Sequence, residues 1–369
     1  MARRASREDV IAARNPRRGC RKVLQSLGTI LVFGIIFLIA GGWFFYRALT
    51  SPYKGYPEAK KDVEVRHGLR TSTILRHMQQ HGIVRDPYVP LIYMKLLRRN
   101  DSIKAGVYEF DRPLSAAEVL EKLIRGDVIL RSVTVREGLD RFAVGKLFVA
   151  EGFGNAQQWD KLTADPELVR DIAPNAKSLE GYLFPDTYKF NPGTTQATIV
   201  KAMVANFRKH FTGEMAYITT GLDVHDTVTL ASIVETEARL PNERPLVASV
   251  YLNRLHKRML LGADPTVIYA IKLAGRWDGN IHKADLQIDS PYNTYRFPGL
   301  PPGPIANPGL ASLRAAAAPA STNYLYFVAR HDSSHAFSSN INEHNRNVEI
   351  YQRQWYRNQR QQAAGSTQQ

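Results

Sequence analysis

Residues 230–244 read LASIVETEARLPNER and place two glutamates, Glu235 and Glu237, in an apolar segment with helical periodicity. On a helix with about 100° per residue, Glu237 falls on the same stripe as Leu230 and Ile233. A carboxylate on an apolar stripe loses its water, which raises its pKa, and a general acid must stay protonated near neutral pH. The pattern makes Glu237 a candidate catalytic acid, although such a glutamate can also extend to solvent.

The same periodicity turns Glu235 to the opposite side of the helix, where Arg239 lies one turn further on. A glutamate–arginine pair four residues apart is the ordinary solvated arrangement and contributes about 0.3 kcal/mol. A Leu-Pro pair ends this helix, and two more helices are predicted, over 243–258 and from Asp264. We expect three short helices in succession to form a compact helical pocket, with Glu237 near the end of the first.

Residues 27–46 contain no charged side chain. As a helix this segment is about 30 Å long, enough to cross the hydrocarbon core of a bilayer. Aromatic residues end the segment and arginines precede it, which favours a cytoplasmic N-terminus and an extracytoplasmic remainder. A cleaved signal peptide is the alternative, but the segment is long for an h-region and no A-x-A site follows. We expect a single-pass anchor in the cytoplasmic (inner) membrane.

The formal net charge of +15 would suit a nucleic-acid-binding protein. Much of the excess lies before residue 27, where membrane orientation and anionic lipid explain it, so we expect no nucleic-acid partner. Cys20 is the only cysteine and lies before the apolar segment, which excludes a disulfide in the outer region. The histidines lack ligand spacing, so we expect neither a metal nor another cofactor.

The remaining pattern predicts an α+β protein with two folded parts. Residues 62–136 alternate short strands and helices, and such a module resembles a LysM-like glycan-binding unit, although the pattern is generic. Later segments are mostly helical, with paired strands over 323–329 and 334–338. The predicted divisions are a basic segment (1–26), a transmembrane helix (27–46), a linker (47–61), the LysM-like module (62–136), a mainly helical catalytic domain with a few strands (137–352) and a disordered tail (353–369).

Two irregular segments carry candidate sugar-binding residues. In SLEGYLFPDTYKF (178–190), aromatic residues alternate with carboxylates, which suits stacking on sugar rings but also a loop that packs its aromatics on a core. SPYNTYRFPGLPPGPIANPG (290–309) is rich in proline and glycine and either lines a cleft or packs and caps turns. The candidate substrate-binding residues are Glu180, Asp186, Asp264, Asn293, Thr294 and Tyr295.

Several of these segments together resemble one known family. LASIVETEA, ERPLVASVYLNRLHKRMLLGADPTVIYA, SPYNTYRFPGLPPGPIANPGLASLRAAA and NYLYFVA are similar, in this order, to the endolytic murein transglycosylases, the YceG-like proteins. The likeness covers about residues 60–350 and includes SLEGYLFPDTY, the LysM-like module and the anchor. In the family motif A-S-I-[VI]-E-x-E the second glutamate is catalytic, and it corresponds to Glu237.

The resemblance implies a lyase that acts on peptidoglycan glycan strands. Such an enzyme cleaves the β-1,4 bond between N-acetylmuramic acid and N-acetylglucosamine within a strand and leaves a 1,6-anhydromuramyl end. It also implies a role in ending nascent strands near the peptidoglycan synthases. Two alternatives stay open: a hydrolase, with Glu180, Asp186 or Asp264 as a second carboxylate, and a non-catalytic scaffold that binds the wall.

Overall fold

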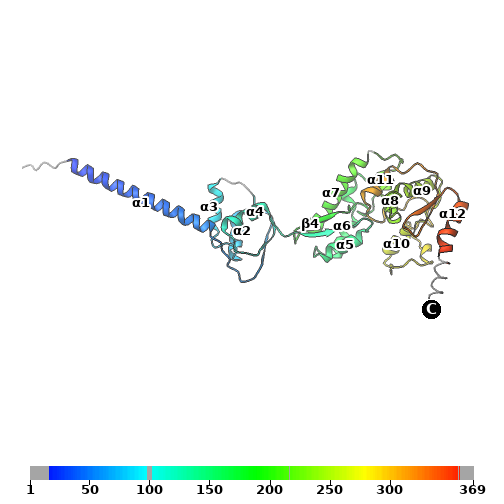
Figure 1. Cartoon of the computed structure of the whole chain (residues 1–369), viewed down its shortest axis with the longest axis horizontal. Helices are drawn as coiled ribbons and strands as arrows, with labels where there is room; N and C mark the ends of the chain where they lie inside the picture. Colours follow the sequence, from blue (N-terminus) through cyan, green and yellow to red (C-terminus); the bar gives the residue numbers. More distant parts are fainter. Residues whose placement is uncertain (1–15, 98–101, 216, 356, 358–369) are drawn as a thin grey trace, which may run out of the picture. The chain divides into compact units, whose positions relative to one another are not determined.

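The structure, a computed structural model, describes residues 16–97, 102–215, 217–355 and 357. The chain forms two compact units, Met1–Ile129 and Leu130–Gln369 (Figure 1). Most of the predicted disordered tail (353–369) and the first fifteen residues of the predicted basic segment (1–26) lie outside the described residues.

The first unit begins with the long helix α1 (Pro16–Thr50). Its stretch Leu27–Thr50 has a mean hydropathy of 2.3, and none of its most apolar window is buried within the protein. This helix is long and apolar enough to cross a membrane, in agreement with the predicted span at 27–46.

The rest of the first unit is a small α+β module. Strands β1 (Lys61–Val65) and β2 (Gly106–Phe110) pair antiparallel, from Lys61 opposite Phe110 to Val65 opposite Gly106. Apolar side chains from both strands and from the helices form one core. The helices are α2 (Thr71–Gln80), α3 (Tyr88–Leu96) and α4 (Ala116–Arg125). This order of strands and helices is the predicted one, while the LysM-like assignment stays a prediction.

Local sequence signals account for α4. Ser115 accepts a hydrogen bond from the backbone of Glu118, and the Glu118 carboxylate accepts one from the backbone of Ser115, which forms a capping box. Gly126 ends the helix with a φ of 75°, a left-handed conformation that favours glycine. Both ends of α4 are therefore set by residues next to the helix.

Two predicted boundaries are wrong. The predicted linker (47–61) packs onto the module, since Tyr56 is 7% exposed and its hydroxyl donates to the carbonyl of Phe110 at 2.8 Å. The last residues of the predicted LysM-like module (62–136) do not belong to the first unit. They include β3 (Arg131–Thr134), which pairs antiparallel with β4 (Thr187–Phe190), so the second unit begins at Leu130 and not at residue 137.

The second unit is mainly helical with two separate strand pairs. The strands β5 (Tyr326–Ala329) and β6 (His335–Ser338) form the second pair, which confirms the hairpin predicted from residue 323. The helices are α5 (Arg141–Ala150), α6 (Ala156–Ala164), α7 (Gln196–Met215), α8 (Val224–Glu237), α9 (Arg244–His256), α10 (Asp264–Leu273), α11 (Leu310–Ala317), α12 (Ile341–Val348), the 3-10 turns Glu167–Val169 and Asp285–Gln287, and the π-helical turn Glu349–Gln354.

Helix α8 lies at the centre of the second unit, against α9, α10 and α11. Its residues from Thr227 to Val234 are buried without exception, so the helix has no solvent face there. Its hydroxyl groups bond within the protein, as when Ser232 Oγ donates to the carbonyl of Thr229 at 2.7 Å. The single apolar stripe expected from the sequence is therefore wrong, because α8 is covered on all sides.

Candidate active site

Glu237 is the last residue of α8, at the point where the chain leaves the buried helix. Its next neighbour, Ala238, has an extended backbone, so the helix ends there and the carboxylate lies half-buried near the surface. The Tyr251 hydroxyl, from the facing helix α9, donates to Glu237 Oε1 at 3.3 Å. The site therefore joins the end of one central helix to the middle of the next.

The pKa of Glu237 is raised to about 7, chiefly by burial. The negative charge of Asp264 adds to the rise, while the Tyr251 hydroxyl and the cation of Arg254 oppose it. Burial disfavours the charged carboxylate, and a second carboxylate nearby has the same effect. Near neutral pH a large share of Glu237 therefore carries a proton.

Asp264 and Tyr295 form the second part of the site. Asp264 is the first residue of α10, and its Oδ1 accepts a hydrogen bond from the Tyr295 hydroxyl at 2.6 Å. Both side chains are exposed, with Tyr295 at 38%. The charge of Glu237 contributes to the raised pKa of Tyr295, after burial and Asp264, which places the three groups near one another.

Asn293 and Thr294 lie in the interior, at 0% and 1% exposure, so the expected contacts of their side chains with a sugar do not fit the structure. Thr294 Oγ1 accepts from the backbone of Ala263 at 3.0 Å, and Asn293 Nδ2 donates to the carbonyls of Leu286 and Ile288 at 3.0 and 2.9 Å. These bonds hold the loop against the start of α10 and bring Tyr295 to Asp264. Asn293 and Thr294 therefore fix the loop that carries Tyr295.

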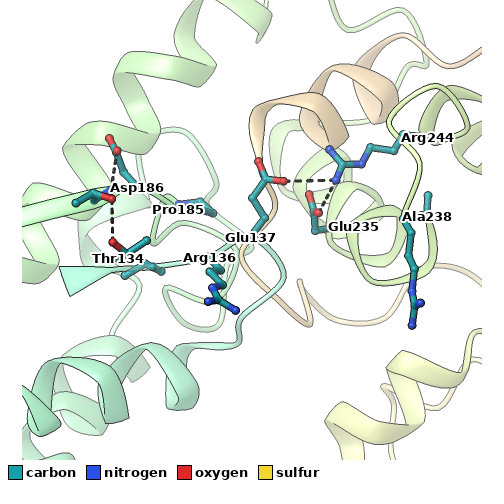
Figure 2. Close-up of a pocket in the computed structure, with 11 residues that line it drawn as sticks. Thr134, Arg136, Glu137, Pro185, Asp186, Glu235, Ala238 and Arg244 are labelled. Atoms are coloured by element: carbon teal, nitrogen blue, oxygen red, sulfur yellow. Dashed lines mark hydrogen bonds and ion pairs between the residues drawn. The ribbon is translucent and has the colours of Figure 1, made fainter. Parts of the chain in front are cut away.

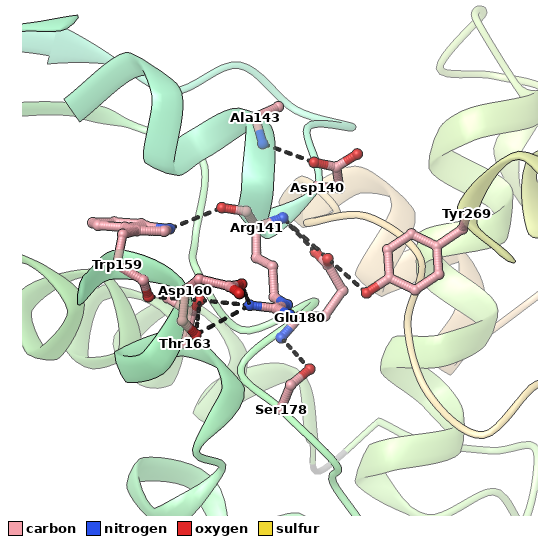
Figure 3. Close-up of polar contacts among 9 residues, drawn as sticks. All are labelled: Asp140, Arg141, Ala143, Trp159, Asp160, Thr163, Ser178, Glu180 and Tyr269. Atoms are coloured by element: carbon pink, nitrogen blue, oxygen red, sulfur yellow. Dashed lines mark hydrogen bonds and ion pairs between the residues drawn. The ribbon is translucent and has the colours of Figure 1, made fainter. Parts of the chain in front are cut away.

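Glu180 is also interior, at 1% exposure, and the expected sugar contact does not fit it either (Figure 3). Its carboxyl oxygens accept hydrogen bonds from the backbone of Arg141, at 3.0 Å, and from the hydroxyl of Tyr269 on α10, also at 3.0 Å. Burial raises the pKa of Glu180 to about 8. Of the two interpretations of residues 178–190, the structure shows the loop that packs its aromatic residues on a core. Leu179 and Tyr182 are at 0% exposure.

Glu235 does not point to water, and it does not pair with Arg239. Its side chain is 5% exposed and forms an ion pair with Arg244 at 2.9 Å, as Figure 2 shows. The backbone of Gly309 donates to its other oxygen at 2.9 Å, and Glu137 reaches the same guanidinium at 3.4 Å. Burial raises the pKa of Glu235, opposed by Gly309 and Arg244.

An open groove of about 590 Å³ lies beside this ion pair (Figure 2). Asp186 is on its wall, exposed, and accepts a hydrogen bond from Asn206 at 2.9 Å. Ala238 and Arg239, which directly follow Glu237, line the same groove. The structure thus brings Glu237, Asp264 and Tyr295 together and leaves Asp186 in the neighbouring groove.

Sequence reasoning missed two residues of the site, Tyr251 and Arg254. Both lie on α9, and Tyr251 is one of its buried residues. Arg254 is held in place because its Nε donates to the carbonyl of Leu325 and its Nη1 to that of Leu261, both at 2.7 Å. Their spacing of three residues on one helix face is the only local signal, and it is weak.

The arrangement suits acid–base chemistry by one carboxyl group. Glu237 is half-buried, partly protonated at neutral pH and hydrogen-bonded to a tyrosine, as a general acid requires. Asp264 raises the pKa of Glu237, and as a carboxylate it also has the chemistry of a nucleophile or of a second base. Within the described ranges, no three or more His, Cys, Asp or Glu side chains are grouped so as to hold a metal ion.

Comparisons with known proteins agree with one another. The profile of the YceG-like family matches residues 63–350. The chain is 33% identical to the endolytic murein transglycosylase of Bacillus subtilis (strain 168), over 85% of this chain and 91% of that protein. It is 30% identical to the endolytic murein transglycosylase of Streptococcus pneumoniae serotype 2 (strain D39), over 87% of this chain and 64% of the relative. A YceG-like protein of Listeria monocytogenes of known crystal structure is 31% identical, with a TM-score of 0.53, over 79% of this chain and 99% of that one.

Proposed function

The chain belongs to the YceG-like family, and we propose that it is a lytic transglycosylase that cleaves peptidoglycan glycan strands at internal bonds. Membership confirms the resemblance that the sequence motifs indicate. The observation that carries the proposal is Glu237, a half-buried carboxyl group with a pKa of about 7 at the end of α8. The relatives named endolytic murein transglycosylases support the same activity.

In the proposed reaction the protonated Glu237 donates to the glycosidic oxygen between N-acetylmuramic acid and N-acetylglucosamine, and the bond from that oxygen to the muramyl C1 breaks. The C6 hydroxyl of the muramyl residue then attacks C1, and the Glu237 carboxylate accepts its proton. The products are a 1,6-anhydromuramyl end and a free C4 hydroxyl, without water. One carboxyl group can therefore serve as acid and then as base.

Hydrolysis is the second candidate, because Asp264 lies near enough to raise the pKa of Glu237. Glycoside hydrolases ordinarily use two carboxyl groups, one of them as nucleophile or as the base that activates water. The hydrogen bond from Tyr295 occupies one Asp264 oxygen and favours a positioning role for this carboxylate. The products distinguish the two reactions.

Further proposals concern the place of the enzyme. Helix α1 anchors it in the cytoplasmic membrane with the N-terminus inside, and both the LysM-like module and the second unit lie outside. There the first unit contacts glycan, and cleavage of new strands near the peptidoglycan synthases ends their elongation. A non-catalytic scaffold is disfavoured because the acid, its tyrosine partner and the neighbouring carboxylate are all present.

The test is product analysis with the full-length protein in detergent and isolated sacculi. We expect mass spectrometry to find 1,6-anhydromuramyl ends and Glu237→Gln to lower their rate of formation by about 100-fold or more, the usual range for a general acid. Glu167→Gln is the control, since Glu167 is an exposed glutamate of the same unit, in the 3-10 turn Glu167–Val169 and outside the site. Hydrated reducing ends would establish the hydrolase. Unchanged activity in Glu237→Gln would reject the mechanism, and no product at all would favour the scaffold.

A further inference from the structure

The first unit holds a pocket of about 630 Å³ where the last turns of α1 meet the module. Trp43 and Arg47 line it from α1, and Tyr53, Arg85 and Leu114 line it from the rest of the unit. The backbone of Tyr53 exchanges hydrogen bonds with that of Leu114 at 2.9 and 3.3 Å. The chain that leaves α1 is therefore fixed to the module, and the pocket has defined walls.

Two arginines give this pocket a positive charge. Arg47 lies 5.4 Å from the ring centre of Trp43, and Arg85 lies 5.1 Å from that of Tyr53. In the part of the chain that the structure describes, neither guanidinium has a carboxylate partner. Asp86 also lines the pocket, but it accepts a hydrogen bond from the backbone at the start of α3, at 2.6 Å. Two guanidinium groups against one engaged carboxylate suit a phosphate.

Helix α3, which follows the pocket, is apolar on two faces. Pro90 and Met94 are buried in the module, while Tyr88, Ile92 and Leu96 are exposed by 63%, 45% and 68%. The exposed residues are four apart and form one stripe along the helix. An exposed apolar stripe on a helix whose other face is already buried is typical of a surface that meets a membrane or a partner. Exposure of these three side chains to water costs free energy, which contact with an apolar environment would remove.

The pocket and the stripe lie at the same end of the first unit. Helix α3 contacts α1, and Figure 1 shows it beside the C-terminal end of that helix. The apolar stretch of α1 ends at Thr50, after exposed aromatic residues that include Trp43, Phe44 and Tyr46. Such aromatic side chains gather at the level of the lipid head groups. A membrane-spanning α1 would therefore bring Arg47, Arg85 and α3 to the outer surface of the bilayer.

We propose that the Arg47–Arg85 pocket binds the phosphate of an anionic phospholipid while the Tyr88–Leu96 stripe of α3 enters the membrane interface. The proposal rests on the membrane anchoring in the proposed function and adds a specific lipid site to it. The lipid phosphate pairs with the two guanidinium groups, and its acyl chains run beside α1 and under α3. The first unit is then held on the bilayer instead of hanging from a single helix.

The depth of α3 can be measured by spin labelling of the full-length chain in phosphatidylcholine–phosphatidylglycerol nanodiscs. Cys20→Ser removes the only cysteine, and a nitroxide is then attached at Leu96→Cys or at the control Leu69→Cys. Leu69 is an exposed leucine of the same unit, at 41%, outside α3. We expect the label at 96 to collide more often with oxygen than with a water-soluble nickel chelate. We expect the label at 69 to be fully accessible to the nickel chelate. Equal exposure of both labels to nickel would overturn the proposal.

The lipid site is tested by native mass spectrometry of the same chain released from the discs. We expect Arg85→Gln to lower the fraction of protein that retains phosphatidylglycerol about fivefold, the change expected for one basic residue at an anionic surface. Arg76→Gln is the control, since Arg76 is an exposed arginine of α2 that does not line the pocket. Equal retention in both variants, or displacement of the lipid by inorganic phosphate alone, would overturn the phospholipid site.

Flotation of the discs separates this proposal from the one on which it rests. A chain that does not float with the lipid contradicts both the anchor and the lipid site. A chain that floats but retains no phosphatidylglycerol contradicts the lipid site alone. Formation of anhydromuramyl ends from sacculi tests the second unit separately, because none of the substituted residues lies in it.

Discussion

At the scale of single residues, the pKa of Glu237 predicts a pH dependence. The proposed acid must be protonated, and its pKa is about 7, so we expect kcat to be constant below pH 7 and to fall about tenfold for each further pH unit above it. Asp264→Asn removes a charge that raises this pKa, so the falling limb should move to lower pH. Rates of anhydromuramyl formation across pH 5–9 provide the measurement, with wild type as reference. A limb that stays in place would mean that Glu237 is not the group that titrates.

The ion pair of Glu235 is the second prediction at this scale. Arg244→Ala leaves a carboxylate with 5% exposure and without its cation, which should destabilise the protein by about 3–5 kcal/mol. Arg239→Ala, the partner expected from helical spacing, should change the stability by less than about 0.5 kcal/mol because Arg239 is exposed. Urea unfolding followed by circular dichroism compares the two. Equal effects would contradict the burial of this pair.

At the scale of elements, two helical glycines should respond in opposite directions to alanine. A methyl group at Gly145 in α5 would overlap the ring of Trp159, which is 2% exposed and donates from Nε1 to the carbonyl of Arg141 at 2.8 Å. We expect Gly145→Ala to cost about 1–3 kcal/mol by overpacking. Gly213 in α7 has no atom within 4 Å of such a methyl group, so Gly213→Ala should stabilise by about 0.5 kcal/mol. Thermal unfolding provides the comparison, and a stabilising Gly145→Ala would show that the Trp159 ring can move.

The elements also show what the sequence could predict. The helix α4 was predictable because its capping box and terminal glycine lie within twelve residues. The burial of α8 on all sides was not predictable from its own periodicity. It depends on the other helices that pack around α8. The catalytic role of Glu237 stays a prediction, and the helical rule that turned Glu235 to water failed because Glu235 pairs with Arg244 in the interior. Glu235 forms its ion pair with Arg244, nine residues later, because the chain turns back after α8.

At the scale of the whole molecule, the predicted division failed at a contact between distant residues. Thr134 pairs with Thr187, 53 residues later, and no pattern near residue 130 indicates that partner. The number and order of the parts were predictable from hydropathy and local periodicity, since an apolar segment, an alternating module and a helical region follow one another. The place where one folded unit ends depends on which strand pairs with which.

This boundary gives the last prediction. A fragment that begins at residue 130 should be more stable than one that begins at residue 137, because the shorter fragment lacks β3 and exposes its strand partner β4. Val133 and Val135 are 3% and 2% exposed, and loss of their burial should cost about 3 kcal/mol or more. The comparison is made by urea unfolding of both fragments with the same C-terminus, each tested on sacculi. Both contain Glu237, Asp264 and Tyr295, so the shorter fragment should lose activity at the lower temperature. Equal stability would place the start of the second unit after β3, where the sequence pattern alone had put it.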